Sequence, residues 1–212
     1  MPTNTYQQGV DAYAGCTDTY PREYYSSSNY GNANELMAAW YVDAGDRSTV
    51  VIRFDISDIS PDVTITSATL QFARKQLVGS GTISIHRCLR DWVELEVTWI
   101  IYSTGNNWES PGGLGAADHD SDAEDTQAPD SPTVFTITDM VQKWVDGTWA
   151  NQGALIKRAS EVDWFVKVHS SEAASSSDRP LLTVVYEEDG EEEEIKLFGI
   201  IGCGVLPFKR AV

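Results

Sequence analysis

The stretch TITSATLQFARK (Thr64–Lys75) indicates the fold class of this chain of 212 residues. Apolar and polar side chains alternate along it, which is typical of a β-strand with one buried face. Other short runs alternate in the same way or are rich in β-branched residues, and turn sequences such as VGSG and SPGGLG separate them. These runs are Ser48–Phe54, Gly81–Leu89, Ser131–Ile137, Gly153–Ala159, Asp163–Ser170 and Arg179–Glu187. The sequence therefore predicts an all-β chain, arranged as a two-sheet antiparallel β-sandwich.

One segment, TITDMVQKWVDG, has the spacing of a short helix instead. Thr138 is the expected N-cap, Asp139 suits the first turn and Gly147 ends the helix. Four apolar residues then fall on one helical face: Met140, Val141, Trp144 and Val145. We expect this helix to close one end of the sandwich.

The charge of the chain excludes one class of partner. Acidic residues outnumber basic ones by 32 to 15, and the formal net charge is −17. Phosphate backbones are bound by clustered Lys and Arg, so we expect no nucleic-acid partner. The hydrophobic content of 42% is high enough for a sizeable core.

The three cysteines, Cys16, Cys88 and Cys203, do not have the spacing of a metal site, and an odd number leaves at least one unpaired. We interpret them as small buried apolar residues. A bridge between Cys16 and Cys88 stays open, because sequence alone does not determine pairing.

The first residues, MPTNTYQQGVDAYAG, contain neither the basic start nor the apolar stretch of a secretory signal. Either the chain does not use that route, or its signal has been removed. No run reaches the roughly 18 apolar residues that a membrane helix needs, so we expect no membrane span.

The acidic loop DHDSDAED places Asp118, Asp120 and Asp122 at alternate positions. Ca²⁺ prefers several hard oxygen ligands, and these carboxylates could converge on one ion. The loop lacks the spacing of an EF-hand, so a solvated acidic loop is the alternative. A weaker candidate cluster for Ca²⁺ consists of Asp11, Asp18 and Asp43. We expect Ca²⁺ at one of these clusters and no other cofactor.

Aromatic residues in loop-like contexts are candidates for a glycan platform, because flat rings stack on sugar faces. Trp108 and Trp149 lie in NNWESPGG and DGTWANQG, and Tyr24 and Tyr25 lie in a tyrosine-rich early loop. Packing in the core is the alternative for both tryptophans. The tryptophans in patterned segments are interpreted as core residues: Trp92, Trp99, Trp144 and Trp164.

Catalytic patterns are not found in this sequence. It contains no GxSxG, HExxH or Walker A pattern. His86, His119 and His169 have no neighbour that marks an activated nucleophile. We expect a protein that is not an enzyme.

The final residues combine charge repulsion with apolar character. Glu187–Glu194 holds seven acids and predicts an extended linker. An apolar segment, residues 195–212, follows it, and its glycines make it a poor helix. Its apolar residues are Leu197, Phe198, Ile200, Ile201, Val205, Leu206 and Phe208. Such a segment can add a strand to a sheet edge, either in its own sandwich or in a neighbouring subunit or protein.

Several blocks of the chain together resemble the DNRLRE domain family, which overlaps carbohydrate-binding module family 96. The early NYGN near Asn29 and four longer blocks carry this resemblance: Arg47–Phe72, Arg90–Trp99, Met140–Lys157 and His169–Tyr186. The resemblance implies a jelly-roll-like sandwich on a surface or outside the cell, without catalysis of its own. Some members are associated with polysaccharide.

These observations predict a sandwich domain over residues 1–186, an acidic linker over 187–194 and an assembly segment over 195–212. The expected function is a non-enzymatic structural module on the surface of a larger assembly, such as a phage virion. The segment 195–212 would mediate a homo-oligomer or a larger protein assembly. The alternative is an extracellular carbohydrate-binding module.

Overall fold

The computed structural model describes residues 1–41, 45–159 and 164–188, and it confirms the predicted all-β sandwich. This part of the chain has one α-helix, α1 (Thr138–Val145), and two short 3-10 helices, η1 (Glu23–Tyr25) and η2 (Ser176–Asp178). The strands are β1 (Thr3–Gln7), β2 (Cys16–Thr19), β3 (Glu35–Tyr41), β4 (Asp46–Ser48), β5 (Val50–Phe54), β6 (Val63–Phe72), β7 (Arg74–Val78), β8 (Ile83–Arg87), β9 (Ile101–Ser103), β10 (Asn106–Asn107), β11 (Asp125–Gln127), β12 (Thr133–Thr136), β13 (Ala154–Arg158), β14 (Trp164–His169) and β15 (Leu181–Glu188).

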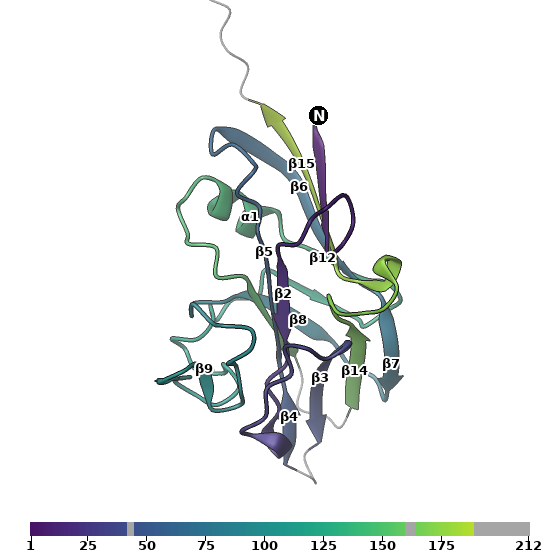
Figure 1. The fold of residues 1–212 in the computed structure, drawn as a ribbon, viewed down its shortest axis with the longest axis vertical. Coiled ribbons are helices and arrows are strands. Elements are labelled where there is room, and N and C mark those ends of the chain that lie inside the picture. The colour runs from purple at the N-terminus through teal and green to yellow at the C-terminus, as the bar shows by residue number, and fades with distance from the viewer. Residues whose placement is uncertain (42–44, 160–163, 189–212) are drawn as a thin grey trace, which may run out of the picture.

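The strands form two facing layers (Figure 1). One layer is a five-stranded sheet in the order β11-β8-β13-β5-β2. The other layer holds two four-stranded sheets, β1-β15-β6-β12 and β4-β3-β14-β7, and only Ala73 separates β6 from β7. Strands β9 and β10 pair with each other alone. Each strand pairing within the described ranges is antiparallel, as predicted.

Strand β6 contains most of the alternating stretch Thr64–Lys75. Its buried side chains include Ile65 and Ala68, which lie three positions apart rather than two or four. The pairing of β6 with β15 shifts register at this point, between Val185 and Tyr186. A register shift of this kind bends a strand and changes the face that its next residues meet. It therefore lets both halves of β6 face the same core.

The main core lies between the two layers and takes residues from all three of their sheets. A second, smaller core, the outer core, lies on the outer face of the five-stranded sheet. The outer loop, which runs from β8 to β11 (residues 88–124), covers it. The buried residues of the outer core are Val51, Cys88, Trp92, Val97, Trp108 and Leu155. Strand β5 serves both cores, because Val50 and Ile52 face the main core and Val51 faces the outer one. A sheet covered on both faces explains why β5 begins with three consecutive buried apolar residues, Val50, Val51 and Ile52.

The cysteines Cys16 and Cys88 are free and buried, so the structure excludes a bridge between them. Cys16 belongs to the main core and Cys88 to the outer core, and the five-stranded sheet separates the two. Burial raises the pKa of the Cys88 thiol to about 11, as expected for a small buried residue that is not reactive. Cys203 lies outside the described residues.

Helix α1 forms where it was predicted, and its N-terminus differs by one residue. The N-cap is Ile137, and Thr138 is the first residue of the helix. The Thr138 hydroxyl accepts a hydrogen bond from the backbone N–H of Ala68 in β6, at 3.0 Å, so it ties the helix to the sheet. Met140 and Val141 are buried, and Gly147 follows the helix with a positive φ of 76°.

Both ends of the described domain lie together. Strand β1 pairs with β15, with Thr3 opposite Val185 (Figure 1). Glu187 and Glu188 pair with Thr64 and Val63 of β6, so the predicted boundary at Tyr186 is two residues too early. The rest of the predicted linker and the assembly segment 195–212 lie outside the described residues. Among the residues described, no helix has both the length and the apolar character needed to cross a membrane.

Candidate functional site

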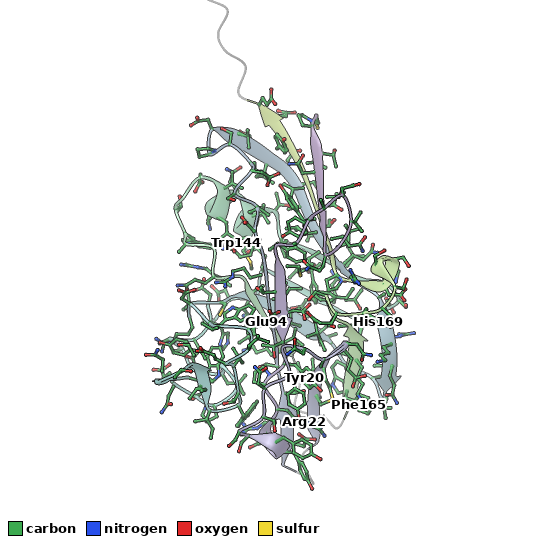
Figure 2. The ribbon with its side chains drawn as sticks, in the orientation of Figure 1. Tyr20, Arg22, Glu94, Trp144, Phe165 and His169 are labelled. Carbon is green, nitrogen blue, oxygen red and sulfur yellow. The ribbon has the colours of Figure 1, made fainter. Side chains whose placement is uncertain are left out.

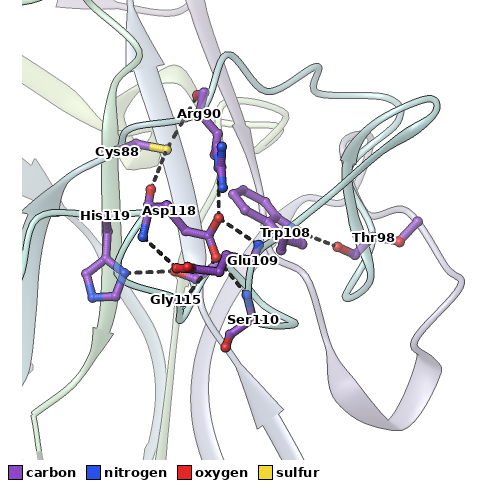
Figure 3. A network of polar contacts seen from close by, with 11 residues as sticks. Cys88, Arg90, Thr98, Trp108, Glu109, Ser110, Gly115, Asp118 and His119 are labelled. Carbon is purple, nitrogen blue, oxygen red and sulfur yellow. Dashed lines mark hydrogen bonds and ion pairs between the residues drawn. The ribbon is translucent and has the colours of Figure 1, made fainter.

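Asp118, a predicted calcium ligand, is instead the centre of a structural network (Figure 3). Its side chain is fully buried and forms an ion pair with Nε of Arg90 at 2.9 Å. Its carboxylate also accepts hydrogen bonds from the backbone N–H groups of Glu109, Ser110 and Gly115, at 2.9–3.0 Å. Burial alone would raise the pKa of Asp118, but these hydrogen bonds outweigh it and lower the pKa. With its oxygens occupied, Asp118 is not available to a metal ion, and the prediction is wrong for this residue.

Asp120 and Asp122, the other two predicted ligands, do not converge with Asp118. They line a hollow of about 360 Å³ that also contains Trp149, a predicted glycan contact. Lys143 Nζ and Arg87 Cζ lie 4.0 and 4.1 Å from the centroid of the Trp149 ring. The structure thus joins residues that the sequence assigned to two separate sites. This hollow surrounds an aromatic ring with both hydrogen-bond donors and acceptors.

Trp108 does not form a glycan platform. Its ring is 4% exposed and packs in the outer core. Its Nε1–H donates to the carbonyl of Thr98 at 3.0 Å (Figure 3). Trp108 therefore fills space beneath the loop as a core residue. The glycan prediction is wrong for this residue, and the alternative, packing in the core, is correct.

Tyr24 and Tyr25 are exposed, with 63% and 47% of their surfaces accessible. Their ring centroids lie 4.8 Å apart with the rings edge to face. Arg22 holds this segment, because its guanidinium donates two-pronged hydrogen bonds to the buried carboxylate of Asp46 and lies 5.2 Å from the Tyr25 ring centroid. The pair lies in η1, at the end of the molecule opposite the start of β1 and the end of β15 (Figure 1).

Three carboxylates that are distant in the sequence meet beside strand β2. Asp18, Glu94 and Glu172 each offer an oxygen, and these oxygens all lie within 4.8 Å of one another. Asp18 is buried, Glu94 is half-buried and Glu172 is exposed, so the cluster runs from the core edge to solvent. It is the only group of this kind within the described part of the chain.

Backbone hydrogen bonds fix the three chain segments around this carboxylate cluster (Asp18, Glu94 and Glu172). Glu94 Oε1 accepts the backbone N–H of Asp18 at 2.8 Å. Asp18 Oδ2 accepts the backbone N–H of Ser171, also at 2.8 Å. Glu172 Oε1 accepts the hydroxyl of Ser171. Glu94 is therefore bound to the segment that carries Asp18, and Asp18 to the segment that carries Glu172, whereas Glu172 bonds to its own neighbour.

The NYGN sequence (Asn29–Asn32) binds the loop that carries Glu94. The Asn29 amide donates to the carbonyls of Glu94 and Val97, at 2.7 and 2.8 Å. Gly31 lies so close to this loop that an added Cβ would stand 2.7 Å from the Glu94 carbonyl oxygen. The early segment therefore positions Glu94, and only glycine fits at position 31 without a shift.

The proximity of like charges changes the acidity of the cluster. Burial, followed by the charge of Glu172, raises the pKa of Asp18 well above its usual value. Burial also raises the pKa of Glu94, and the charge of Glu172 adds to this. Three carboxylates in such a place favour either bound protons or a bound cation.

Two buried histidines, His86 in β8 and His119 in the loop between β8 and β11, are neutral. Nδ1 of His119 lies 2.9 Å from the Gly113 carbonyl oxygen, and its Nε2 lies 2.9 Å from Nζ of Lys157. An ammonium only donates, so Nε2 accepts and Nδ1 carries the proton. His86 Nε2 lies 2.9 Å from Ser84 Oγ, but serine and imidazole are 4% and 3% exposed, which closes this pair to a substrate.

In a comparison with protein-family models, residues 27–184 match the disaggregatase related repeat domain. The chain belongs to this repeat-domain family. The match covers most of the chain and includes nearly all of the four long blocks that carry the DNRLRE resemblance. It does not single out the DNRLRE family, so that finer resemblance stays a prediction. No curated protein matches the chain.

The family match places the carboxylate cluster partly inside the repeat domain. Glu94 and Glu172 lie in the matched segment, and Asp18 lies before it. From sequence, Asp18 was grouped with Asp11 and Asp43, of which Asp43 lies outside the described residues and Asp11 is exposed. Glu94 and Glu172 were missed, although each lies within a block that the resemblance marks. Local spacing does not reveal a cluster whose members come from three distant segments.

Proposed function

We propose that this chain is a non-enzymatic structural module that is displayed on the surface of a larger assembly and held there through its C-terminal segment. The observation that supports this most directly is the position of its ends. β1 and β15 are neighbours, and the exposed Tyr24–Tyr25 pair lies at the far end (Figure 1). A domain attached after Glu188 would therefore project its opposite end away from the attachment point.

Two sequence properties add support. The name of the matched family describes a repeat domain, and repeat domains occur within larger arrays. The apolar residues of 195–212 would be a liability in water unless another surface covers them. A virion surface and the outside of a cell are both settings that suit such a module, with the finer DNRLRE resemblance favouring an exposed location.

The test compares the solution mass of the full chain with that of a chain ending at Glu188. This truncation retains every described strand, including the two residues that extend β15 beyond Tyr186. We expect the full chain to associate and the shorter chain to be a monomer by light scattering. Two monomers of equal thermal stability would reject attachment through this segment.

Carbohydrate binding is a second candidate function, and the hollow around Trp149 favours it. A sugar presents an apolar ring face together with hydroxyl groups that both donate and accept hydrogen bonds. The hollow offers an aromatic ring, the carboxylates of Asp120, Asp122 and Glu124, and the cations of Arg87 and Lys143. These groups match both properties of a sugar.

A polysaccharide panel tests this second function. We expect Trp149→Ala to abolish binding of any polysaccharide that the full chain retains, because it removes the ring from the hollow. Tyr24→Ala is the matched control, since it removes an exposed ring that does not line the hollow. Loss of binding in Tyr24→Ala alone would move the site to η1, and retention in both variants would reject both sites.

A further inference from the structure

Two aspartates of this molecule are buried to the same degree but have opposite surroundings. Asp118 is 0% exposed and Asp18 is 1% exposed. Asp118 has an arginine partner and three backbone donors. Among the described residues, Asp18 has only Ser171 as a hydrogen-bond partner for its carboxylate, through the backbone N–H to Oδ2 and through the hydroxyl. Burial of an ionised carboxylate is costly unless its charge is balanced, so Asp18 requires a partner that Asp118 already has.

The unsatisfied atom of Asp18 identifies where this partner belongs. Oδ1 of Asp18 is buried and has no hydrogen-bond partner in the described structure. Buried polar atoms are rarely left unpaired, and each exception needs a physical reason such as an ion. The acid projects from β2 toward Glu94 and Glu172, and Glu94 lies beside this strand (Figure 2). A cation at this position would supply the missing interaction.

The ion pairs found between described residues do not include Asp18, Glu94 or Glu172. The arginine whose charge lowers the pKa of Glu94 is Arg53, and its guanidinium is paired with Asp91 at 3.1 Å. Three like charges thus face one another at the edge of the core.

The spacing and the ligand type together fit one class of ion. Oxygens bound to a common Ca²⁺ at about 2.3–2.6 Å are separated by at most roughly 5 Å. The three carboxylate oxygens satisfy this limit, since they lie within 4.8 Å of one another. An all-oxygen ligand set suits Ca²⁺ rather than Zn²⁺ or Cu²⁺, which favour nitrogen and sulfur. The exposure of Glu172 leaves an approach for the ion and for water ligands that complete its shell.

We propose that Asp18, Glu94 and Glu172 form a calcium-binding site. Bound Ca²⁺ joins strand β2 to the loop that contains Glu94 and to the turn that contains Glu172. These segments are otherwise connected by the hydrogen bonds that the Glu94 and Asp18 carboxylates accept from the backbone N–H groups of Asp18 and Ser171. Calcium therefore acts as a structural clamp that stabilises the domain, and its removal leaves the acids repelling one another.

Calorimetric titration of the full chain with CaCl₂, after treatment with EGTA, tests the site directly. We expect one saturable binding event per chain, and Glu172→Gln weakens its affinity tenfold or more. Because Glu172 is exposed, this variant keeps the fold. Asp122→Asn is the matched control, since it removes one exposed charge from the loop first considered for calcium and leaves binding unchanged. Weak binding to the acidic residues 187–194 is common to all three proteins and cancels.

Thermal unfolding separates a metal ligand from a merely structural acid. Calcium at about a hundred times its Kd raises the melting temperature of the unsubstituted chain by roughly 5 °C or more. In EGTA, Asp18→Asn is at least as stable as the unsubstituted chain, because it relieves repulsion; in calcium it is the less stable of the two. Equal destabilisation with and without calcium would show a structural role alone. Unchanged calcium affinity in both Asp18→Asn and Glu172→Gln overturns the proposal.

Discussion

At the scale of single residues, the balance between burial and hydrogen bonding decides what each acid does. Asp118 accepts four short hydrogen bonds from residues 90, 109, 110 and 115, and it holds the outer loop in place. Its sequence neighbours, Asp120 and Asp122, face solvent. The alternating DxDxD pattern does not distinguish the buried Asp118 from its two neighbours. It therefore predicted a shared ligand set that the folded loop does not form.

Asp118→Asn tests this structural role. The amide keeps the size of the side chain but removes its charge and places an N–H₂ group among N–H donors. Breaking one partner of a buried ion pair typically costs about 3 kcal/mol of unfolding free energy. We therefore expect a melting temperature lower by roughly 6 °C or more. Asp122→Asn, in the same loop but exposed, should change it by about 1–2 °C at most, and equal effects in the two variants would contradict the network.

A pH effect follows from His86 at the same scale. Burial, with a contribution from the charge of Lys157, lowers the pKa of His86 to about 4. An unfolded histidine has a pKa of about 6.5, so below that pH the unfolded state takes up a proton that the folded state does not. The contribution of neutral, buried His86 to the free energy of unfolding is complete above pH 6.5, and it is lost as the pH falls toward 4.

We expect this loss to be on the order of 2 kcal/mol. Urea unfolding at several pH values between 7.5 and 4.5, for the unsubstituted chain and His86→Gln, isolates the contribution as a difference between two profiles. The neighbouring His119, Lys157 and acids act in both proteins and largely cancel. Parallel profiles would show that His86 does not cause the acid sensitivity.

At the scale of elements, the sequence predicted the seven strands that have a local signature, which are β5, β6, β8, β12, β13, β14 and β15. The other eight, including the seven-residue β3, were not predicted as separate strands. β6 alternates, β5 begins with three consecutive β-branched apolar residues, and α1 has helical spacing. The one-residue difference at Thr138 arises because its hydroxyl bonds to Ala68 of a neighbouring strand rather than to its own helix. A tertiary contact of this kind has no local signal.

The loops show where prediction from sequence stops. Asn29 and Gly31 belong to an early loop, and their partner Glu94 lies more than sixty residues away. The sequence shows the NYGN motif, but it does not show which distant segment the Asn29 amide binds. The same separation hid the cluster of Asp18, Glu94 and Glu172, which exists only once strand β2, a loop and a turn meet.

Asn29→Ala tests the connection between these two loops. It removes two hydrogen bonds to backbone carbonyls, which we expect to cost about 1–3 kcal/mol of unfolding free energy. Displacement of Glu94 should also weaken calcium binding in the titration described above. Asn32→Ala is the control, because Asn32 is exposed in the same loop. A similar loss of stability in the control would mean that the loop, rather than the Asn29 amide, is responsible.

At the scale of the whole molecule, the five-stranded sheet couples two cores. Its inner face packs against the other layer, and its outer face packs against the loop that contains Trp92 and Trp108. Composition alone indicated enough apolar residues for a large core, but it did not show that they divide between two. The division makes the outer loop a part of the domain's stability rather than an appendage.

This arrangement predicts a single cooperative unfolding transition. Val50 and Ile52 face the main core while Val51 between them faces the outer one, so the outer loop cannot leave without exposing a strand that the main core requires. Tryptophan fluorescence reports on both cores, through Trp92 and Trp108 in one and Trp164 in the other, whereas far-ultraviolet circular dichroism reports on the sheets. We expect both signals to change at the same urea concentration. A fluorescence change that precedes the loss of strands would instead show that the outer loop unfolds as a separate unit, and the carboxylate cluster, which takes Glu94 from that loop, would then open before the sandwich does.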